Sequence, residues 1–244
     1  MTRFSMLPLL FVLCACQHGA PPMHPDSMVQ PELPASTGNA ADPQANDAAF
    51  VLPGDFSEGT SVADLEARFG KANVKISDQP GEDGFYHRVV LFPDDPTRRA
   101  FVDFYEADPP SGVHSILVRD RGSKWRGKHG VYVGMSLAEL QKVNGKRFNF
   151  NGFDSEHRGW AHDAWSPALD DDDDQLGKLD VDEGEHMYFN VDLGLRNAAK
   201  ELPPGAWPVD EYSVSSNDPR YPRLGELVEV TAFSATTSLD DEWD

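Results

Sequence analysis

The feature that most constrains the fold of this chain is an internal repeat. The segment 59–71 aligns without gaps on the segment 134–146, at a constant offset of 75 residues, and six of the thirteen paired positions are identical. A chain that carries the same local pattern twice is expected to build the same structural unit twice, because equal sequences have equal local preferences. The sequence therefore predicts two tandem units within one folded body.

Each copy of the repeat has the signature of a short, capped α-helix. A serine stands just before each helix and an acidic residue follows three positions later, which is the spacing of a capping box. A glycine stands where the residue after the helix must adopt a left-handed conformation. The predicted capping residues are Ser61, Asp64 and Gly70 in the first copy and Ser136, Glu139 and Gly145 in the second. Each copy should form a helix of about ten residues with one buried stripe.

Extended segments, bounded by turns rich in Pro, Gly and Asp, follow each of the two helices. The expected strands are 86–92, 100–105 and 113–119 after the first helix, and 159–165, 187–193 and 227–233 after the second. Short turns between neighbouring strands favour an antiparallel meander over a crossover. The predicted fold class is α+β, with two tandem repeats of a short helix followed by an antiparallel β-meander.

The repeat also carries a resemblance to known proteins. Its motif residues are Gly134, Met135, Ser136, Glu139, Leu140 and Gly145 in the second copy and Gly59, Ser61, Leu65 and Gly70 in the first. With this motif the chain resembles the tandem repeat of β-lactamase-inhibitory protein. A single copy is similar to the SmpA/OmlA lipoproteins of the outer-membrane assembly machinery, and the stretches 91–96 and 134–140 resemble a group of bacterial envelope lipoproteins. The resemblance implies a curved sheet with the helices on one face, but little about activity, since the motif residues are caps and core.

Two departures from this pattern mark features of the chain's own. Lys71 and Lys146 stand where a proline often follows the last glycine of the motif. The second copy is also longer, because it carries an acidic insertion over residues 168–186 and a Pro-rich loop before its last strand. Loops added to a scaffold often carry function. The expected organisation is repeat 1 over 50–128, repeat 2 over 129–238 and an acidic tail over 239–244.

The N-terminus predicts export and lipidation. An apolar run over residues 6–13 is too short to cross a bilayer, which takes about 20 residues, so residues 1–15 are expected to be a signal peptide. Residues 13–16 resemble the bacterial lipobox, which implies cleavage before Cys16 and a lipid anchor on it. An ordinary secreted protein with a chance cysteine near its cleavage site is the alternative. Gln17, in place of the aspartate that retains lipoproteins at the inner membrane, implies the periplasmic face of the outer membrane.

Residues 16–49 should form a tether between the lipid and the body. They contain six prolines among small and polar residues and show no apolar periodicity. Such a segment cannot bury enough surface to offset the entropy lost on ordering, so we expect it to be disordered. Because Cys14 leaves with the signal peptide and Cys16 is acylated, no thiol remains for a disulfide, a nucleophile or a metal site.

Charge and the absence of catalytic motifs narrow the function. The chain has 41 Asp and Glu against 21 Lys and Arg, a formal charge of −20, and such a field repels phosphate backbones, which excludes nucleic acid as a partner. The sequence contains no Gly-x-Ser-x-Gly turn, no phosphate-binding loop and no dinucleotide fingerprint. These patterns favour a non-enzymatic role.

Two clusters could nevertheless bind metal ions. The acidic insertion offers Asp172, Asp174, Asp180 and Glu183 in partial register with a calcium loop, although Leu176 occupies a position that should supply an oxygen. The alternative is a solvated, self-repelling loop. A zinc or hydrolase centre could use His157 and His186 together with Asp172 and Asp174. His157 and His162 are five residues apart, which on a strand places them on opposite faces and argues against a shared zinc.

Aromatic side chains are the remaining indication of function. We predict that Trp160, Trp165, Trp207 and Tyr188 contact a partner protein, since aromatic rings are common interface anchors. The alternative is that most of them fill the core. The resulting hypothesis is a non-enzymatic envelope lipoprotein that binds another envelope protein on its concave sheet face, with membrane contact through the lipid alone. An inhibitor of an envelope or extracellular hydrolase and a metal-dependent hydrolase are the alternatives.

Overall fold

The computed structural model describes residues 47–81, 84–107, 109–153, 159–161, 165, 177–181, 186–203 and 205–237. The predicted signal peptide, Cys16, most of the tether, the acidic run of the insertion and the tail therefore lie outside the described residues. Within the described part of the chain, no helix is long and apolar enough to span a membrane.

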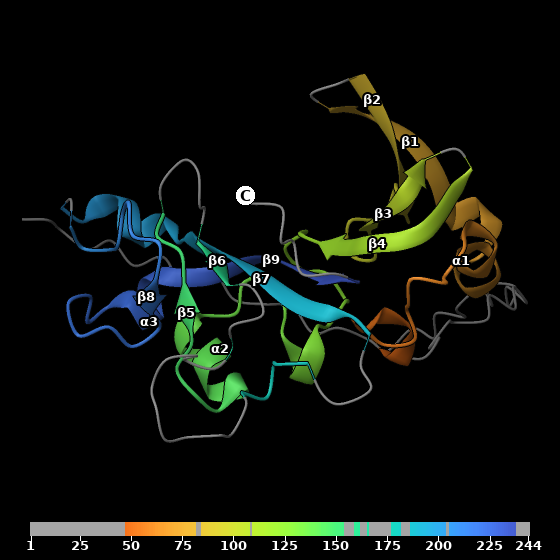
Figure 1. Ribbon diagram of the computed structural model, residues 1–244. Coiled ribbons are helices and arrows are strands. Elements are labelled where there is room, and N and C mark those ends of the chain that lie inside the picture. The colour runs from red at the N-terminus through yellow and green to blue at the C-terminus, as the bar shows by residue number, and fades with distance from the viewer. Residues whose placement is uncertain are drawn as a thin grey trace, which may run out of the picture. The chain divides into compact units, whose positions relative to one another are not determined.

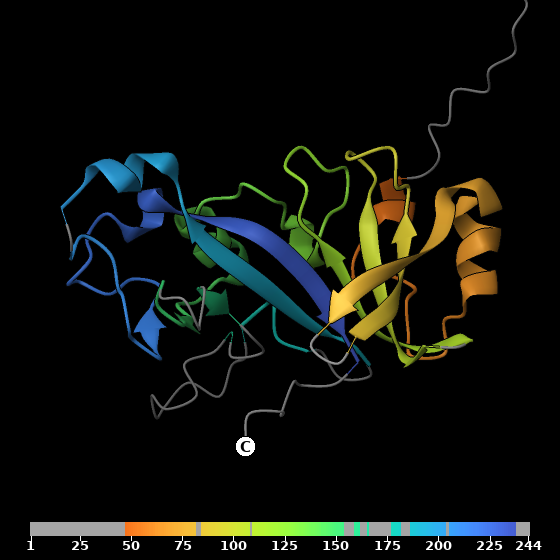
Figure 2. The ribbon, with the colours of Figure 1, turned by 90° about the horizontal axis from the view of Figure 1, so that it is seen from above.

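Seven strands form one antiparallel sheet (Figure 1), in the order β1-β2-β3-β4-β9-β7-β6. Their bounds are β1 Val74–Gly81, β2 Gly84–Leu91, β3 Ala100–Ala107, β4 Pro110–Val118, β6 Trp160–Ala161, β7 Tyr188–Leu195 and β9 Val228–Thr236. A separate pair joins β5 (Asn149–Phe150) to β8 (Val214–Ser215). Below, the first half of the body means residues 50–128 and the second half means residues 129–238. Figure 2 shows β7 and β9 side by side as the two long strands of the second half. The last strand of each half, β4 and β9, pair with each other and so join the halves into one sheet.

Three short α-helices and four 3₁₀ turns complete the described fold. The helices are α1 Val62–Phe69, α2 Leu137–Asn144 and α3 Leu224–Leu227. The 3₁₀ turns are η1 Asp47–Phe50, η2 Lys71–Asn73, η3 Lys128–Gly130 and η4 Asn197–Glu201. Helix α1 lies beside the strands of the first half, and α2 lies beside α3 in the second (Figure 1).

The two predicted capping boxes are confirmed. The Ser61 hydroxyl accepts from the Asp64 backbone N–H at 3.2 Å, and the Asp64 carboxylate accepts from the Ser61 N–H at 2.9 Å. Ser136 and Glu139 make the same pair of bonds at 3.3 and 2.9 Å. The Ser61 and Ser136 hydroxyls also donate to the carboxylates of Asp64 and Glu139, at 2.5 and 2.6 Å. These hydroxyl bonds, followed by those from the serine backbone N–H groups, hold the pKa of both carboxyl groups below its ordinary value. Gly145 adopts the predicted left-handed conformation, whereas this prediction is wrong for Gly70, whose φ is 84° but whose ψ of 136° is extended.

Replacement of Ser136 by alanine should lower the free energy of unfolding by about 0.5 to 2 kcal/mol, because the first turn of α2 loses its cap. Urea unfolding of the variant beside the parent protein measures the loss. Ser136→Asn is the control, since asparagine supplies an equivalent acceptor and should retain most of the stability. Equal midpoints for the alanine variant and the parent would contradict the cap's contribution.

The prediction of an α+β fold with antiparallel strands is confirmed, and each of the six expected strands overlaps an observed one. The predicted curvature is wrong, because the sheet is open and does not curl. Sheets curl where bulges and glycine kinks recur along neighbouring strands, and the described strand pairs shift register only at Asp103/Phe104 and Asp192/Leu193. The halves also differ, since the second inserts η4, β8 and α3 between β7 and β9.

One face of the sheet packs on the core. Along β3 and β4, side chains with no exposed surface alternate with half-buried ones, as expected for strands with one covered face. The fully buried set on these two strands is Ala100, Val102, Val113, Ile116 and Val118. The opposite face, which bears Phe101, Asp103, Ser115 and Leu117, is called the open face below. Leu65 and Phe69 of α1 join the same core as Leu137 and Leu140 of α2.

Candidate functional site

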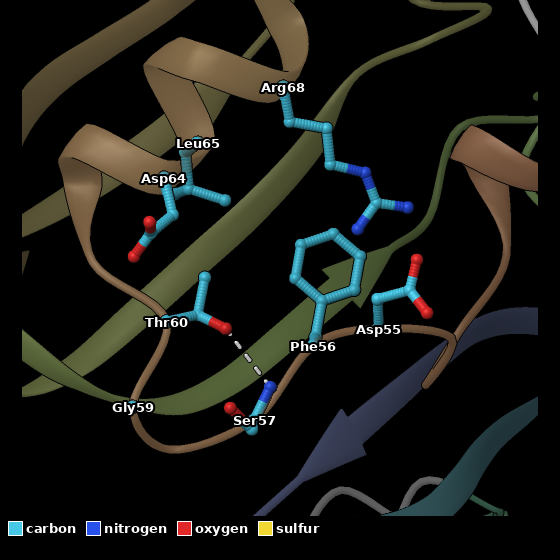
Figure 3. Close-up of a pocket in the computed structure, with 8 residues that line it drawn as sticks. All are labelled: Asp55, Phe56, Ser57, Gly59, Thr60, Asp64, Leu65 and Arg68. Carbon is cyan, nitrogen blue, oxygen red and sulfur yellow. Dashed lines mark hydrogen bonds between the residues drawn. The ribbon is translucent and has the colours of Figure 1, made fainter.

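A pocket of about 440 Å³ lies between α1 and the loop that precedes it (Figure 3). Its lining residues are Asp55, Phe56, Ser57, Gly59, Thr60, Asp64, Leu65 and Arg68. The loop is held by hydrogen bonds from the Ser57 N–H to the Thr60 hydroxyl and from the Thr60 N–H to the Ser57 carbonyl, both 3.0 Å. The volume falls in the range of small-molecule sites, which runs from roughly 300 to 1,000 Å³.

Arg68 is the main charged group of this pocket, and its contacts are structural. It donates from Nη2 to the Ala49 carbonyl at 2.9 Å, which ties η1 to α1. Its guanidinium lies 4.5 Å from the centre of the Phe56 ring and 5.0 Å from that of Phe69. Burial lowers the pKa of Arg68, and the nearby Asp55 carboxylate opposes that shift. The guanidinium therefore joins elements of the first half.

The Asp64 carboxylate at the edge of this pocket is not suited to act as a general acid. The Asp64 carboxylate is bound to the Ser61 backbone and hydroxyl, and its lowered pKa keeps it ionised. A general acid needs a raised pKa, which usually comes from burial or from a like charge. The pKa of Asp64 is lowered instead, so this carboxyl group does not meet that requirement. Only its volume is therefore typical of a small-molecule site.

The four aromatic residues predicted to contact a partner do not form one surface. Trp165 is only 1% exposed and donates from Nε1 to the Phe189 carbonyl at 2.8 Å, so its prediction as a partner contact is wrong. Trp160 and Tyr188 are half-buried on β6 and β7. Trp207 lies in the loop between η4 and β8 and packs partly against the core. Large apolar rings are buried wherever the fold can cover them.

Asp180, one of the predicted calcium ligands, has a structural role. One carboxylate oxygen accepts from the Trp165 backbone N–H at 3.2 Å and the other accepts from the Gly177 N–H. Asn144 at the end of α2 donates to the Trp165 carbonyl at 2.6 Å and accepts from the Leu179 N–H at 3.1 Å. These bonds join α2 to the chain on both sides of residues 166–176 and explain why Asp180 is buried.

The other predicted metal ligands cannot be placed in this network. Asp172, Asp174, Glu183 and His157 lie outside the described residues, and His186 is exposed. Within the described part of the chain, no three His, Cys, Asp or Glu side chains gather as a metal site would require.

A cluster of arginines on the open face is a candidate site that local sequence patterns do not predict. The guanidinium carbons of Arg119, Arg88 and Arg99 lie 4.4, 5.5 and 6.0 Å from the centre of the Phe101 ring. Arginines at this distance from an aromatic ring are attracted by its π electrons. Phe101 is half-buried and lies opposite Leu117 in the β3–β4 pair. We call the three arginines with Phe101 the arginine cluster.

Two members of the arginine cluster are fixed by carboxylates. Arg88 forms a bidentate pair with Asp103, with distances of 2.6 and 2.7 Å. Arg99 forms another with Asp120, with distances of 2.9 and 2.8 Å, and this pairing raises the pKa of Arg99. Arg119 is exposed and has neither a hydrogen bond nor an ion pair with any described residue. Two charges of the cluster are thus balanced, and one is available.

A signal for this cluster is present in the sequence. Each of the three arginines directly neighbours a residue that the structure buries, namely Val89, Ala100 or Val118. Because side chains alternate along a strand, all three must point to the same, opposite face once the strands are paired. The pairing itself joins residues far apart in the chain, and local patterns do not supply it.

No protein-family model matches the chain, and no match was found among curated proteins or solved structures. The fold and the site define an α+β protein with an open antiparallel sheet and an arginine cluster on the sheet face opposite the core. The functional expectations that follow from the sequence resemblance therefore remain predictions.

A turn next to the arginine cluster gives a pH-dependent prediction. Asp95 accepts hydrogen bonds from the Thr97 hydroxyl and backbone and from the Arg98 guanidinium, which together lower its pKa to about 2. The folded pKa is below the unfolded value, so the stabilisation is complete above about pH 4 and is lost as pH falls through 2. The stability difference between the parent protein and Asp95→Asn should therefore shrink as pH falls from 5 towards 2.

Denaturant unfolding at a series of pH values measures this difference. Asp94→Asn is the matched control, since Asp94 is the exposed neighbour of Asp95. If the stability difference between the parent protein and Asp95→Asn were constant with pH, the Asp95 carboxylate would not stabilise the fold through its charge.

Proposed function

We propose that the chain is a non-enzymatic lipoprotein of the bacterial cell envelope, anchored through Cys16, whose open sheet face binds another envelope protein. The lipobox-like residues 13–16 and the Pro-rich segment after them support the anchor and tether. Gln17 supports a location on the periplasmic face of the outer membrane. The observation that carries the binding role is the arginine cluster.

The arginine cluster has the physical properties of a protein-binding hot spot. Arginine and aromatic side chains dominate such hot spots, because they combine a large contact area with directional hydrogen bonding. The bidentate pairs to Asp103 and Asp120 hold Arg88 and Arg99 in place before a partner arrives. Pre-ordered side chains lose less conformational entropy on binding, so more of the contact energy appears as affinity.

We also infer that the two halves derive from one duplicated unit. The support is the pair of capping boxes at Ser61 and Ser136, 75 residues apart, each followed by antiparallel strands. The pairing of β4 with β9 is what two such units would give if their last strands met. The longer second half then represents the copy that acquired insertions, as loops on the surface tolerate them best.

The lipid anchor makes a direct prediction. Cys16→Ser should abolish incorporation of labelled palmitate and move the protein from the membrane fraction to the soluble periplasmic fraction, since the acyl chain carries its membrane affinity. Cys14→Ser is the control and should leave both properties unchanged. The proposed lipid anchor at Cys16 would be wrong if Cys16→Ser still incorporated labelled palmitate. It would also be wrong if the parent protein were found in the membrane fraction without any label.

Site-specific photocrosslinking in intact cells tests the binding role. A photoreactive residue at Leu117, on the open face, should capture one discrete envelope protein. The same residue at Ala63, which is exposed on α1, should not. Arg119→Glu should abolish the adduct at Leu117. The identity of the captured protein separates a structural partner from a hydrolase that the chain inhibits. No adduct at Leu117 together with a strong adduct at Ala63 would contradict the assignment of the face.

A further inference from the structure

We propose that the arginine cluster, with Lys75 beside it, binds a carboxylate-rich segment of a partner protein. The inference rests on the proposed function, because it assumes that the open face contacts a protein, and it adds the chemistry of the segment that is recognised. Arg119 and Lys75 pair with the carboxylates, and Phe101 and Leu117 contact the aliphatic carbons of the same segment.

The register of the sheet places these groups in one row. Lys75 of β1 lies opposite Val90 of β2, Val90 lies opposite Phe101 of β3, and Phe101 lies opposite Leu117 of β4. Directly opposed side chains share a face of the sheet and lie about 4.5 to 5.5 Å apart at Cβ. The row therefore has an apolar middle and a lysine at one end, and Arg119 stacks over its Phe101 ring.

The charges around this row are unbalanced in favour of cations. Arg88 and Arg99 are paired with Asp103 and Asp120, respectively. Arg119 and Lys75 are exposed, and neither has a hydrogen bond or ion pair with a described residue. A guanidinium stacked on a ring keeps the N–H groups at its edge available for bidentate pairing with a carboxylate. The row thus presents two cations that no described residue pairs.

The rest of the chain favours a short acidic segment over a long polyanion. Residues 50–128 hold 11 Lys and Arg against 13 Asp and Glu, whereas residues 129–238 hold 9 against 20. The second half therefore repels any extended polyanion laid across both halves. Screening limits that repulsion to about 8 Å at physiological salt. An acidic segment of a few residues can bind entirely over the near-neutral first half. Its affinity then depends on the ion pairs that its carboxylates form with nearby cations.

Fluorescence anisotropy with the full chain tests the proposal. The probe is a labelled ten-residue peptide of alternating glutamate and alanine, and its control has glutamine in place of glutamate. The glutamate peptide should bind at least ten times more tightly than the glutamine peptide, and its affinity should fall as salt is raised. Arg119→Gln and Lys75→Gln should each weaken binding of the glutamate peptide three- to tenfold.

Arg223→Gln is the matched control variant, because Arg223 is also an exposed arginine but lies next to α3. Its affinity for the glutamate peptide should equal that of the parent. Equal binding of both peptides, or equal losses in Arg119→Gln and Arg223→Gln, would overturn the proposal. Crosslinking at Leu117 that persists in Arg119→Gln, while the glutamate peptide fails to bind, would overturn the acidic ligand and leave the proposed function standing.

The chain's own acidic tail is the competing occupant. Residues 239–244 contain Asp240, Asp241, Glu242 and Asp244, and β9 ends beside β4, with the Thr237 N–H bonded to the His114 carbonyl. A full chain with these four carboxylates replaced by amides distinguishes the two occupants. Unchanged affinity for the glutamate peptide supports an external segment. An affinity that rises tenfold or more would assign the row to the tail and overturn the proposal.

Discussion

Replacement of Trp165 by alanine is expected to lower the free energy of unfolding by about 3 to 5 kcal/mol, the cost of truncating a buried tryptophan. The ring is 1% exposed and lies 4.9 Å from the Phe148 ring, between centroids. Its indole N–H bonds to the Phe189 carbonyl, which would lose that partner. For a body of this size, the melting temperature should fall by roughly 6 to 20 °C.

Trp160→Ala is the matched control for this variant. Trp160 precedes Trp165 by five residues but is half-buried on β6, so its loss should cost less than half as much. Calorimetry of both variants and the parent provides the comparison. The reverse order, with Trp160→Ala the more damaging, would contradict the central position of Trp165 in the core.

Replacement of Trp125 by alanine is expected to have an effect of the same size, about 3 to 5 kcal/mol, in the first half. Trp125 has no exposed surface, and its ring lies 5.2, 6.0 and 6.1 Å from those of Phe50, Phe69 and Phe56. These residues come from η1, from α1 and from the loop between them, so one ring joins three segments to the chain after β4. Removal of the Trp125 ring should therefore weaken the packing of η1, α1 and the loop between them.

Trp125→Phe separates packing from hydrogen bonding at this site. Phenylalanine retains most of the ring volume but loses the indole N–H, which donates to the Arg98 carbonyl at 2.6 Å, and should cost about 1 to 3 kcal/mol. Tyr212→Ala is the surface control, since Tyr212 is 73% exposed and its truncation should change stability by about 0.5 kcal/mol or less. Equal melting temperatures for Trp125→Ala and Tyr212→Ala would contradict the central position of Trp125.

Both α-helices of the repeat were predictable from the sequence, because a capping box is completed within four residues. The predicted length of about ten residues was close to the eight observed. Strand β1 was missed because Val74–Gly81 contains Lys75, Asp78 and Pro80, which are unfavourable inside a sheet. An edge strand tolerates them and even needs such residues to prevent further pairing. Position at the edge is a property of the sheet, so the segment alone did not indicate it.

The candidate site was harder to predict than the fold. An aromatic ring such as that of Trp165 suits an interface as well as a core, and the structure buries Trp165. Asp180 was assigned to calcium by spacing, whereas its oxygens accept hydrogen bonds from the Trp165 and Gly177 backbone. In each case the same side chain suits two roles, and the neighbours that decide between them are distant in the chain.

The two capped helices, most of the strands and the α+β class follow from local sequence, since these depend on side chains within a few residues of one another. Three features depend instead on contacts between distant parts of the chain: the pairing of β4 with β9, the covering of one sheet face, and the grouping of Arg88, Arg99 and Arg119 around Phe101. All three rest on the register of the strands. A shift of one residue in any strand pair would turn every side chain to the other face, and that register is set by the packing of the whole core.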